Sequence, residues 1–280
     1  MTLRFWGVAC LVVAGLVSAA LAQIPLPTAN PQTQFSSGQS VVPVYEGWMK
    51  NPDGTFTFVF GYFNRNRKEE PVIPAGPNNK LEPGPADRGQ PTFFLPRRQP
   101  WVFRVQVPAD WGQKELVWSI TVNGKTERAY AQMILEEEIL ERMIMARGNL
   151  NPGEDDPNKP PTVTIAPVTG ATLANPVTLT ATVTDDGLPK PRVPKTPSPD
   201  ANGTAQVNNS GRLLPTGLNV TWYQYGGPAK VDFDSTGPIA VSNGRAPVTA
   251  RFTAPGTYIL RALASDGGLQ KAAEITVTVK

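Results

Sequence analysis

The chain has 280 residues, with 26 basic and 23 acidic side chains and a formal net charge of +3. This small excess predicts no nucleic-acid partner, and the absence of histidine excludes histidine-based catalytic triads and the commonest zinc ligand. The 30 prolines and 25 glycines favour strands and turns over helices, and the length allows two modest domains.

Residues 1–22 have the layout of a secretory signal peptide. Arg4 lies near the start, an apolar run follows at 8–17, and the cleavage-site pattern Ala20-Leu21-Ala22 precedes Gln23. The apolar run is short for a membrane-spanning helix, so we expect a cleaved leader, with an uncleaved anchor as the alternative. The only cysteine, Cys10, leaves with that leader. The mature chain is expected to have no transmembrane segment and to be secreted, periplasmic or at the cell surface.

Residues 23–40 are rich in Pro, Gln, Ser and Thr and predict a disordered lead. A β-sandwich domain is then expected over 41–131. Within it, aromatic residues alternate along a strand that follows an Asn-Pro-Asp-Gly turn, and Asn123-Gly124 is typical of a two-residue hairpin. The alternating aromatics are Phe56, Phe58, Phe60 and Tyr62. We interpret them as a core face, with a sugar-binding platform as the alternative.

A long polar passage at 64–99 interrupts this domain. Loops of this length inside a domain are usually functional or disordered. The charged and amide-rich start of the passage is therefore the binding candidate of the first domain, and a solvated loop is the alternative. The candidate residues are Asn64, Arg65, Asn66 and Glu69.

Residues 132–148 predict one amphipathic helix that ends at Gly148. Leu135, Ile139 and Met143 fall on one apolar stripe, and acidic residues supply the opposite face. Such a helix would cover the first sandwich or the seam between the domains, or it would bind a partner. The Pro-rich and acidic stretch at 149–161 predicts a linker.

A second domain is expected over 162–280, because short runs of alternating apolar residues recur between turn signals. The predicted strands lie at 162–166, 177–184, 218–223, 229–233, 246–252, 257–264 and 272–279. A Pro-rich insert at 190–215 separates the second strand from the third. Seven short strands of this kind describe an immunoglobulin-like sandwich, with Trp222 placed to pack between its sheets and Tyr258 placed as a tyrosine-corner residue. The predicted fold is therefore mainly β, with two Ig-like antiparallel β-sandwich domains joined by a helix and a Pro-rich linker.

An ordered set of short motifs in this second domain resembles a known family. The motifs are Thr184-Asp185-Asp186-Gly187-Leu188-Pro189, Val220-Thr221-Trp222, Ala254-Pro255-Gly256-Thr257-Tyr258, Ser265-Asp266-Gly267 and the closing Ile275-Thr276-Val277-Thr278-Val279. Together they resemble the polycystic-kidney-disease (PKD) and related Ig-like repeats of extracellular proteins, without the Trp-Asp-Phe-Gly-Asp-Gly string of the best-known members. The first domain is similar to uncharacterised secreted bacterial proteins. The resemblance implies a non-catalytic exported module for adhesion, spacing or surface assembly.

Ig-like topology would bring the loops after the second, fourth and sixth strands to one end of the sandwich. Asp185, Asp186 and Asp266 lie on these loops, with Asp234 as a further neighbour, and converging carboxylates suit calcium. Aspartate before glycine is also ordinary turn chemistry, and no regular calcium-loop spacing is present, so turns are favoured over a metal site. Calcium is thus the one cofactor considered.

The sequence favours a non-enzymatic protein that binds a protein or cell-envelope partner. A carbohydrate-binding accessory is one alternative, and it requires several of Trp48, Trp101, Trp111 and Trp118 to lie exposed in a row. A carboxylate-dependent hydrolase is the other, using Glu69 with Glu70 or Asp155 with Asp156. Adjacent residues on a strand point to opposite faces, which argues against such pairs.

Overall fold

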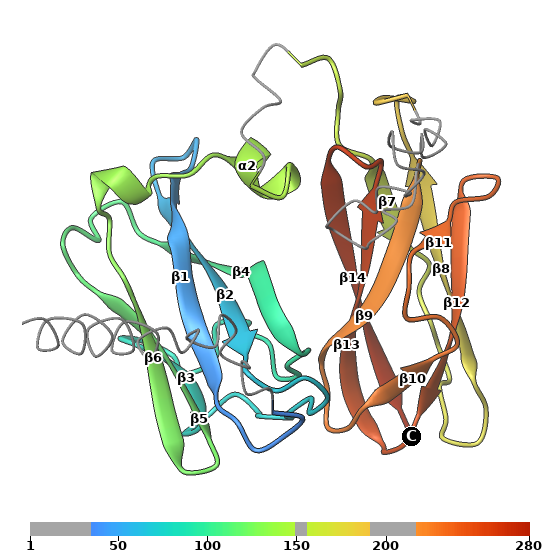
Figure 1. The fold of residues 1–280 in the computed structure, drawn as a ribbon, viewed down its shortest axis with the longest axis horizontal. Coiled ribbons are helices and arrows are strands. Elements are labelled where there is room, and N and C mark those ends of the chain that lie inside the picture. The colour runs from blue at the N-terminus through green and yellow to red at the C-terminus, as the bar shows by residue number, and fades with distance from the viewer. Residues whose placement is uncertain (1–34, 149–155, 191–216) are drawn as a thin grey trace, which may run out of the picture. The chain divides into compact units, whose positions relative to one another are not determined.

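Antiparallel β-strands make up nearly all the regular structure of the described residues in the computed structural model (Figure 1). The structure describes residues 35–148, 156–190 and 217–280. Over those ranges two short helical turns are the only helices, and no helix is long and apolar enough to cross a membrane. The mainly β prediction is confirmed. The predicted leader at 1–22 and nearly all of the Pro-rich insert lie outside the described residues.

The first sheet of the N-terminal sandwich has the strand order β1-β2-β4. Its strands are β1 (Val41–Lys50), β2 (Phe56–Asn64) and β4 (Arg97–Val107), and all pair antiparallel. In the predicted turn between β1 and β2, Gly54 adopts a φ of +84° and donates its N–H to the carbonyl of Asn51 at 3.0 Å. Residues with a side chain rarely adopt that φ, so the turn favours glycine.

The second sheet of this sandwich has the strand order β3-β5-β6. Its strands are β3 (Asn79–Glu82), β5 (Leu116–Val122) and β6 (Lys125–Ala131). Asn123 and Gly124 join β5 to β6, and their φ values of 51° and 75° are both positive. Positive φ at both positions is what the predicted two-residue hairpin requires.

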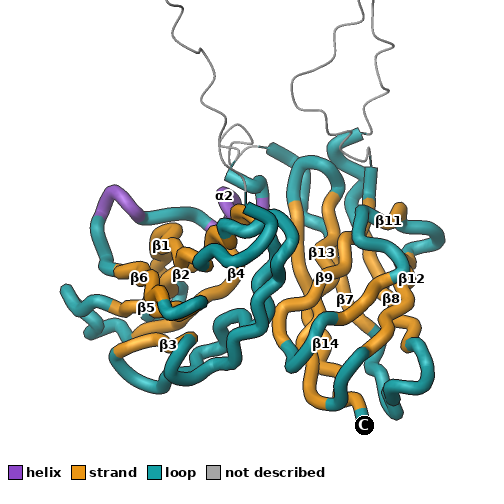
Figure 2. Tube along the Cα trace, turned by 60° about the horizontal axis from the view of Figure 1, so that its bottom comes forward, coloured by secondary structure: helices purple, strands orange, loops and turns teal. Residues whose placement is uncertain are grey.

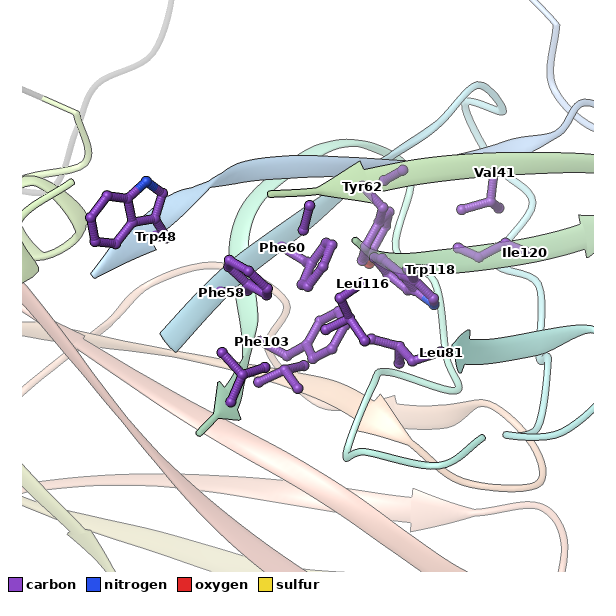
Figure 3. Close-up of a cluster of buried hydrophobic side chains, with 14 of the residues drawn as sticks. Val41, Trp48, Phe58, Phe60, Tyr62, Leu81, Phe103, Leu116, Trp118 and Ile120 are labelled. Atoms are coloured by element: carbon purple, nitrogen blue, oxygen red, sulfur yellow. The ribbon is translucent and has the colours of Figure 1, made fainter. Parts of the chain in front are cut away.

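An aromatic core lies between these two sheets (Figure 3). The Trp118 ring packs against the rings of Phe60 and Phe103, with centroid distances of 5.9 Å and 4.7 Å. Both pairs are T-shaped, the geometry that the ring quadrupoles prefer. Phe58 and Phe60 are fully buried, so the alternating aromatics form a core face and not a sugar-binding platform. Burial of each such ring stabilises the fold by about 1.5–3 kcal/mol.

The continuous helix predicted for 132–148 does not form. The segment instead contains a 3-10 turn, η1 (Leu135–Glu137), and a short helix, α2 (Glu141–Met145). Ile139, between them, donates its N–H to the carbonyl of Trp48 on β1 at 2.9 Å, and the Trp48 indole donates to another carbonyl of the segment at 2.7 Å. These hydrogen bonds and the burial of Ile139 outweigh the local helical propensity, so the segment lies along β1.

The C-terminal sandwich has the two sheets β10-β12-β8-β7 and β11-β9-β13-β14. The first contains β7 (Thr162–Ile165), β8 (Val177–Thr184), β10 (Val231–Phe233) and β12 (Arg245–Phe252), and the second contains β9 (Asn219–Gly226), β11 (Ile239–Ala240), β13 (Gly256–Ser265) and β14 (Gln270–Val279). With the two-residue β11 set aside, strands lettered in chain order give A-B-E-D on one sheet and C-F-G on the other. That is the constant-type immunoglobulin arrangement, and it confirms the Ig-like prediction.

Two aromatic residues hold the core of this sandwich as predicted. Trp222 on β9 is 2 % exposed, and its indole N–H donates to the carbonyl of Ala246 at 3.3 Å. Tyr258 is fully buried, and its hydroxyl donates to the carbonyl of Ala254 at 2.7 Å, which is the tyrosine-corner hydrogen bond. Gly227 lies against this ring, and a β-carbon there would collide with a ring carbon of Tyr258.

The two sandwiches share a seam within the unit formed by Phe35–Lys280. Tyr225, on β9 of the C-terminal sandwich, belongs to the aromatic core of the N-terminal one and is 4 % exposed. Its hydroxyl donates to the carbonyl of Gly89, and its own carbonyl accepts from the backbone N–H groups of Thr92 and Phe93, each at 3.2 Å. The sandwiches are therefore joined by direct contacts as well as by the chain between them, of which 149–155 lies outside the described residues.

Arg261 on β13 completes the seam. Its guanidinium stands 3.6 Å from the centroid of the Tyr225 ring, its Nε donates to Glu274 at 2.6 Å, and one Nη donates to the carbonyl of Val102 on β4. The side chain is only 12 % exposed, so this cation–π and hydrogen-bond set is partly desolvated and stronger than a surface ion pair.

Candidate functional site at one end of the C-terminal sandwich

Three segments meet at the end of the C-terminal sandwich where β8 and β13 finish, and all three are loops (teal in Figure 2). Thr162 pairs with Thr184, which places the segment before β7 beside the loop after β8. Lys159 donates its backbone N–H to Asp186 at 3.0 Å, which ties the same two segments together. Beyond Ser265, the β13–β14 loop contacts both of them through Gly268, whose β-carbon position lies 3.0 Å from an Asn158 nitrogen and 3.3 Å from Pro189.

Asp185 lies at the start of the loop after β8. Its Oδ2 accepts the N–H of Gly187 at 2.9 Å, while its Oδ1 is buried and has no hydrogen-bond partner in the described part of the chain. Burial raises the pKa of the Asp185 carboxyl above its ordinary value, and the negative charges of Asp266 and Asp186 raise it further. The two loops therefore bring Asp185 and Asp266 close enough to repel each other.

Asp266 is 4 % exposed, which is unusual for a carboxylate. Its Oδ1 accepts the backbone N–H groups of Gly268 and Leu269, both at 2.6 Å, and so closes the predicted turn. Its Oδ2 is buried and has no hydrogen-bond partner. One oxygen of Asp266 thus forms the turn, and the other has no partner among the described residues.

Asp186 and Asp234 do not join this pair. Both oxygens of Asp186 are used by backbone N–H groups, from Leu188 at 2.9 Å and Lys159 at 3.0 Å, and these bonds hold its pKa below the ordinary value. Asp234 accepts the N–H of Thr249, a residue that pairs near the start of β8 and not near its end. Over the described part of the chain no three His, Cys, Asp or Glu side chains are placed to hold a metal ion together.

Asn158 is the residue of this site that the sequence did not indicate. It is 5 % exposed, and its Oδ1 is buried with no hydrogen-bond partner within 35–148, 156–190 and 217–280. Its own N–H donates to Asp156 at 3.0 Å, so the local sequence shows only an ordinary asparagine turn in a Pro-rich stretch. The burial that distinguishes Asn158 arises from the tertiary contact with the β13–β14 loop.

The residues proposed for binding in the first domain have mainly structural contacts. Asn64 and Asn66 are fully buried. Asn64 donates to the carbonyls of Glu69 and Phe94 at 2.8 and 3.1 Å, and Asn66 donates to the carbonyl of Gln39 at 3.0 Å. We therefore interpret both asparagines as braces of the loop after β2. Only the Arg65 side chain is exposed in this group.

The lead predicted as disordered is ordered over 35–40. Gly38 donates its N–H to a carboxylate oxygen of Glu69 at 2.5 Å, and the N–H of Arg65 donates to the carbonyl of Ser40 at 3.2 Å. The prediction failed here because it considered apolar burial alone, and these residues are held by hydrogen bonds to the loop after β2. The rest of the lead lies outside the described residues.

The tryptophan row required for carbohydrate binding is not present. Trp48, Trp111 and Trp118 are at most 9 % exposed, and Trp101 packs beside the buried Ile139. Strand alternation turned Trp48 and Trp118 inward, Trp111 is buried in the turn after β4, and Trp101 alone of the four is partly exposed, so the four indoles form no exposed row.

A cleft of about 1330 Å³ lies along the seam and contains carboxylates from both sandwiches. Glu70 pairs with Lys230 at 2.7 Å, Glu141 pairs with Arg104 at 2.8 Å, and the third, Glu274, pairs with Arg261. Each carboxylate therefore has a cationic partner. Of the pairs considered for hydrolysis, Glu69 and Glu70 have separate structural partners, Asp156 pairs with Arg142 at 3.1 Å, and Asp155 lies outside the described residues.

No protein-family model and no curated protein sequence matches the chain. Among solved structures, a chimeric titin Z1Z2 carrying an exogenous decorin peptide is 12% identical, with a TM-score of 0.25 over 87% of this chain and 99% of that one. The D00-D0 domain of intimin is 13% identical, with a TM-score of 0.27 over 90% of this chain and 98% of that one. These TM-scores are too low to support a fold assignment, which therefore depends on the strand order described above.

Proposed function

We propose that this chain is an exported, non-catalytic protein that acts as a binding or structural module for a protein or cell-envelope partner. The observation that carries the proposal is the seam, where a side chain of one sandwich is part of the core of the other. Two Ig-like sandwiches joined in this way present their outer strands and loops as one body. That property suits adhesion, spacing or surface assembly.

The contacts at the seam support the proposal because they are directional. Tyr225 and Arg261 make hydrogen bonds to Gly89 and Val102 of the other sandwich, and Lys230 pairs with Glu70 across it. The bond from Arg261 is charge-assisted and partly desolvated, and directional bonds of these kinds restrict orientation in a way that apolar contact alone does not. Partner surfaces on the two sandwiches would then keep a fixed spacing.

Export is the second part of the proposal, and it is supported by the arrangement of residues 1–22. The only cysteine falls in that segment, so the mature chain has no disulfide with which to stabilise itself outside the cell. The two hydrophobic cores and the buried asparagine braces supply stability without one. This arrangement suits a chain that folds after export with no oxidation step.

Fractionation of the native cell, followed by cross-linking and mass spectrometry, tests both parts. We expect a mature chain that begins at Gln23, is found outside the cytoplasm, and cross-links to one recurrent envelope or surface protein. A leader variant carrying Val12→Asp and Val13→Asp is the matched control and should stay uncleaved inside the cell. A cytoplasmic wild-type chain with an intact N-terminus would end the export proposal.

A further inference from the structure

We propose that Asp185, Asp266 and Asn158 form a binding site for a divalent cation, and that Ca²⁺ is the ion that suits it. The inference goes beyond the module function proposed above and does not depend on it. It revises the set of three aspartates indicated by the sequence, because Asp186 is used elsewhere and Asn158 takes its place.

Three side-chain oxygens carry the inference. Asp185 Oδ1, Asp266 Oδ2 and Asn158 Oδ1 are each buried, and each lacks a hydrogen-bond partner among the residues that the structure describes. Asp266 and Asn158 are more than nine-tenths buried as whole residues. A buried polar atom without a partner is costly to the fold, and native proteins contain few of them. Three such oxygens lie on adjoining segments, and one cation bound by all of them would satisfy all three.

These oxygens come from segments that are in contact. Asn158 lies against Gly268, two residues beyond Asp266, and Lys159 is hydrogen-bonded to Asp186, the neighbour of Asp185. The charge of Asp266 also acts on Asp185, which places the two carboxylates within electrostatic reach of each other. The site thus combines two neighbouring negative charges with one amide oxygen.

This chemistry identifies the class of ligand. A water molecule would satisfy at most two acceptors and would leave the repulsion between the carboxylates in place, whereas a divalent cation removes both problems. Carboxylate and amide oxygens are hard ligands, and the chain has no histidine to attract zinc or copper. Ca²⁺ is favoured over Mg²⁺ because it accepts irregular sets of six to eight oxygens, which backbone carbonyls and water would complete.

The position of the site implies a role in joining the two sandwiches. Arg142 on α2 pairs with Asp156 at 3.1 Å and donates to the carbonyl of Asn158 at 3.4 Å. A cation on Asn158 would fasten the segment before β7 to the C-terminal loops, while Arg142 connects that segment to the N-terminal sandwich. Ion binding is therefore expected to stiffen the junction and to raise the melting temperature.

Titration of the purified full chain with CaCl₂ after EDTA treatment and dialysis tests the proposal. We expect one saturable site by isothermal titration calorimetry and a melting temperature several degrees higher in millimolar CaCl₂ than in EDTA. Asp185→Asn and Asp266→Asn, which keep shape and remove one charge, should each weaken Ca²⁺ binding at least tenfold. Asn158→Ala should weaken it as well.

Asp186→Asn is the matched control, since it removes a neighbouring charge whose oxygens serve backbone N–H groups. Its Ca²⁺ affinity should stay within about twofold of wild type. Failure of the wild-type chain to bind Ca²⁺ up to 10 mM would overturn the proposal whatever the variants do. Equal weakening by Asp186→Asn would also overturn it, by showing diffuse charge attraction, and tighter binding of MgCl₂ than of CaCl₂ would overturn the assignment to Ca²⁺. None of these results bears on export, which fractionation tests separately.

Discussion

Polar groups are buried both at the seam between the sandwiches and at the loop end of the C-terminal sandwich. The two regions differ in whether these groups have hydrogen-bond partners. At the seam, Tyr225 and Arg261 find hydrogen-bond, ion-pair and ring partners on both sides. At the loop end, Asp185 and Asp266 each leave an oxygen without a partner. A buried polar group with its partners in place serves the fold, whereas one without them points to a ligand from outside. Substitutions should therefore have opposite consequences in the two regions.

The largest effect should come from removal of the Tyr225 ring. Tyr225→Ala deletes a buried aromatic shared by the seam and the N-terminal core, and we expect it to lower the free energy of unfolding by about 3–5 kcal/mol. Tyr225→Phe removes only the hydroxyl that donates to Gly89 and should cost about 1 kcal/mol. Urea denaturation of both variants measures the difference. If the Ala variant unfolds in a single transition with wild-type stability, the seam does not couple the sandwiches.

Arg261 should have the next largest effect. Arg261→Ala removes the pair with Glu274 and the hydrogen bond to Val102, and a loss of about 2–3 kcal/mol is expected. Arg261→Lys keeps the charge but not the planar fork or the stacking on Tyr225, so it should recover about half of that loss. Thermal unfolding of both variants is the measurement. Full recovery by lysine would show that charge alone matters at the seam.

Alkaline pH should weaken the fold at the seam, where Tyr62, Tyr223 and Tyr225 all line the cleft. Burial raises the pKa of Tyr62, Tyr223 and Tyr225 above the ordinary value of 10.0. An unfolded chain releases these protons from about pH 10 upward while the folded chain retains them, so their stabilising contribution is complete below that pH and is lost above it. Each tyrosine that stays protonated in the folded chain would lower the free energy of unfolding by about 1.4 kcal/mol per pH unit in that range. Melting curves between roughly pH 8 and 11 test this, and Tyr62→Phe with Tyr225→Phe should flatten the decline.

The smallest effect on stability is expected from Asp185→Asn at the loop end, and it distinguishes that region from the seam. In EDTA, Asp185→Asn removes a charge that repels Asp266, so the variant should be as stable as wild type or more stable, by less than about 1 kcal/mol. With CaCl₂ present, the order of melting temperatures should reverse. A loss of several kcal/mol in EDTA would mean that Asp185 serves the fold in the same way as the seam residues do.

The sequence predicted the sheets well because the alternation that defines a strand is local. The strand predicted at 177–184 matches β8, and the inward places of Trp222 and Tyr258 followed from the order of turns and strands. The prediction of a helix at 132–148 was wrong because the interactions that decide its structure are not local. Its apolar spacing suits a helix, but the competing hydrogen bonds come from Trp48, more than 80 residues earlier in the chain.

The candidate site shows the same division between local and distant information. Asp185 and Asp266 could be predicted because Ig topology fixes which loops share an end. Asp186 was included because its position in the chain cannot show that Leu188 and Lys159 take up its carboxylate. Asn158 was missed because its burial depends on a loop more than 100 residues later. The sequence therefore predicted which loops bring the carboxylates together, but it did not predict which hydrogen bonds each polar group makes.

The stretch beside β1 has a consequence for solubility. β1 is an edge strand of its sheet, and its outer side meets residue 138 in a parallel bridge at Trp48, next to the hydrogen bond from Ile139. Uncovered edge strands recruit strands of other molecules and lead to aggregation. The non-helical segment around residues 138 and 139 thus covers the edge of β1 and opposes self-association. Deleting this segment would expose the edge of β1 to strands of other molecules and favour aggregation.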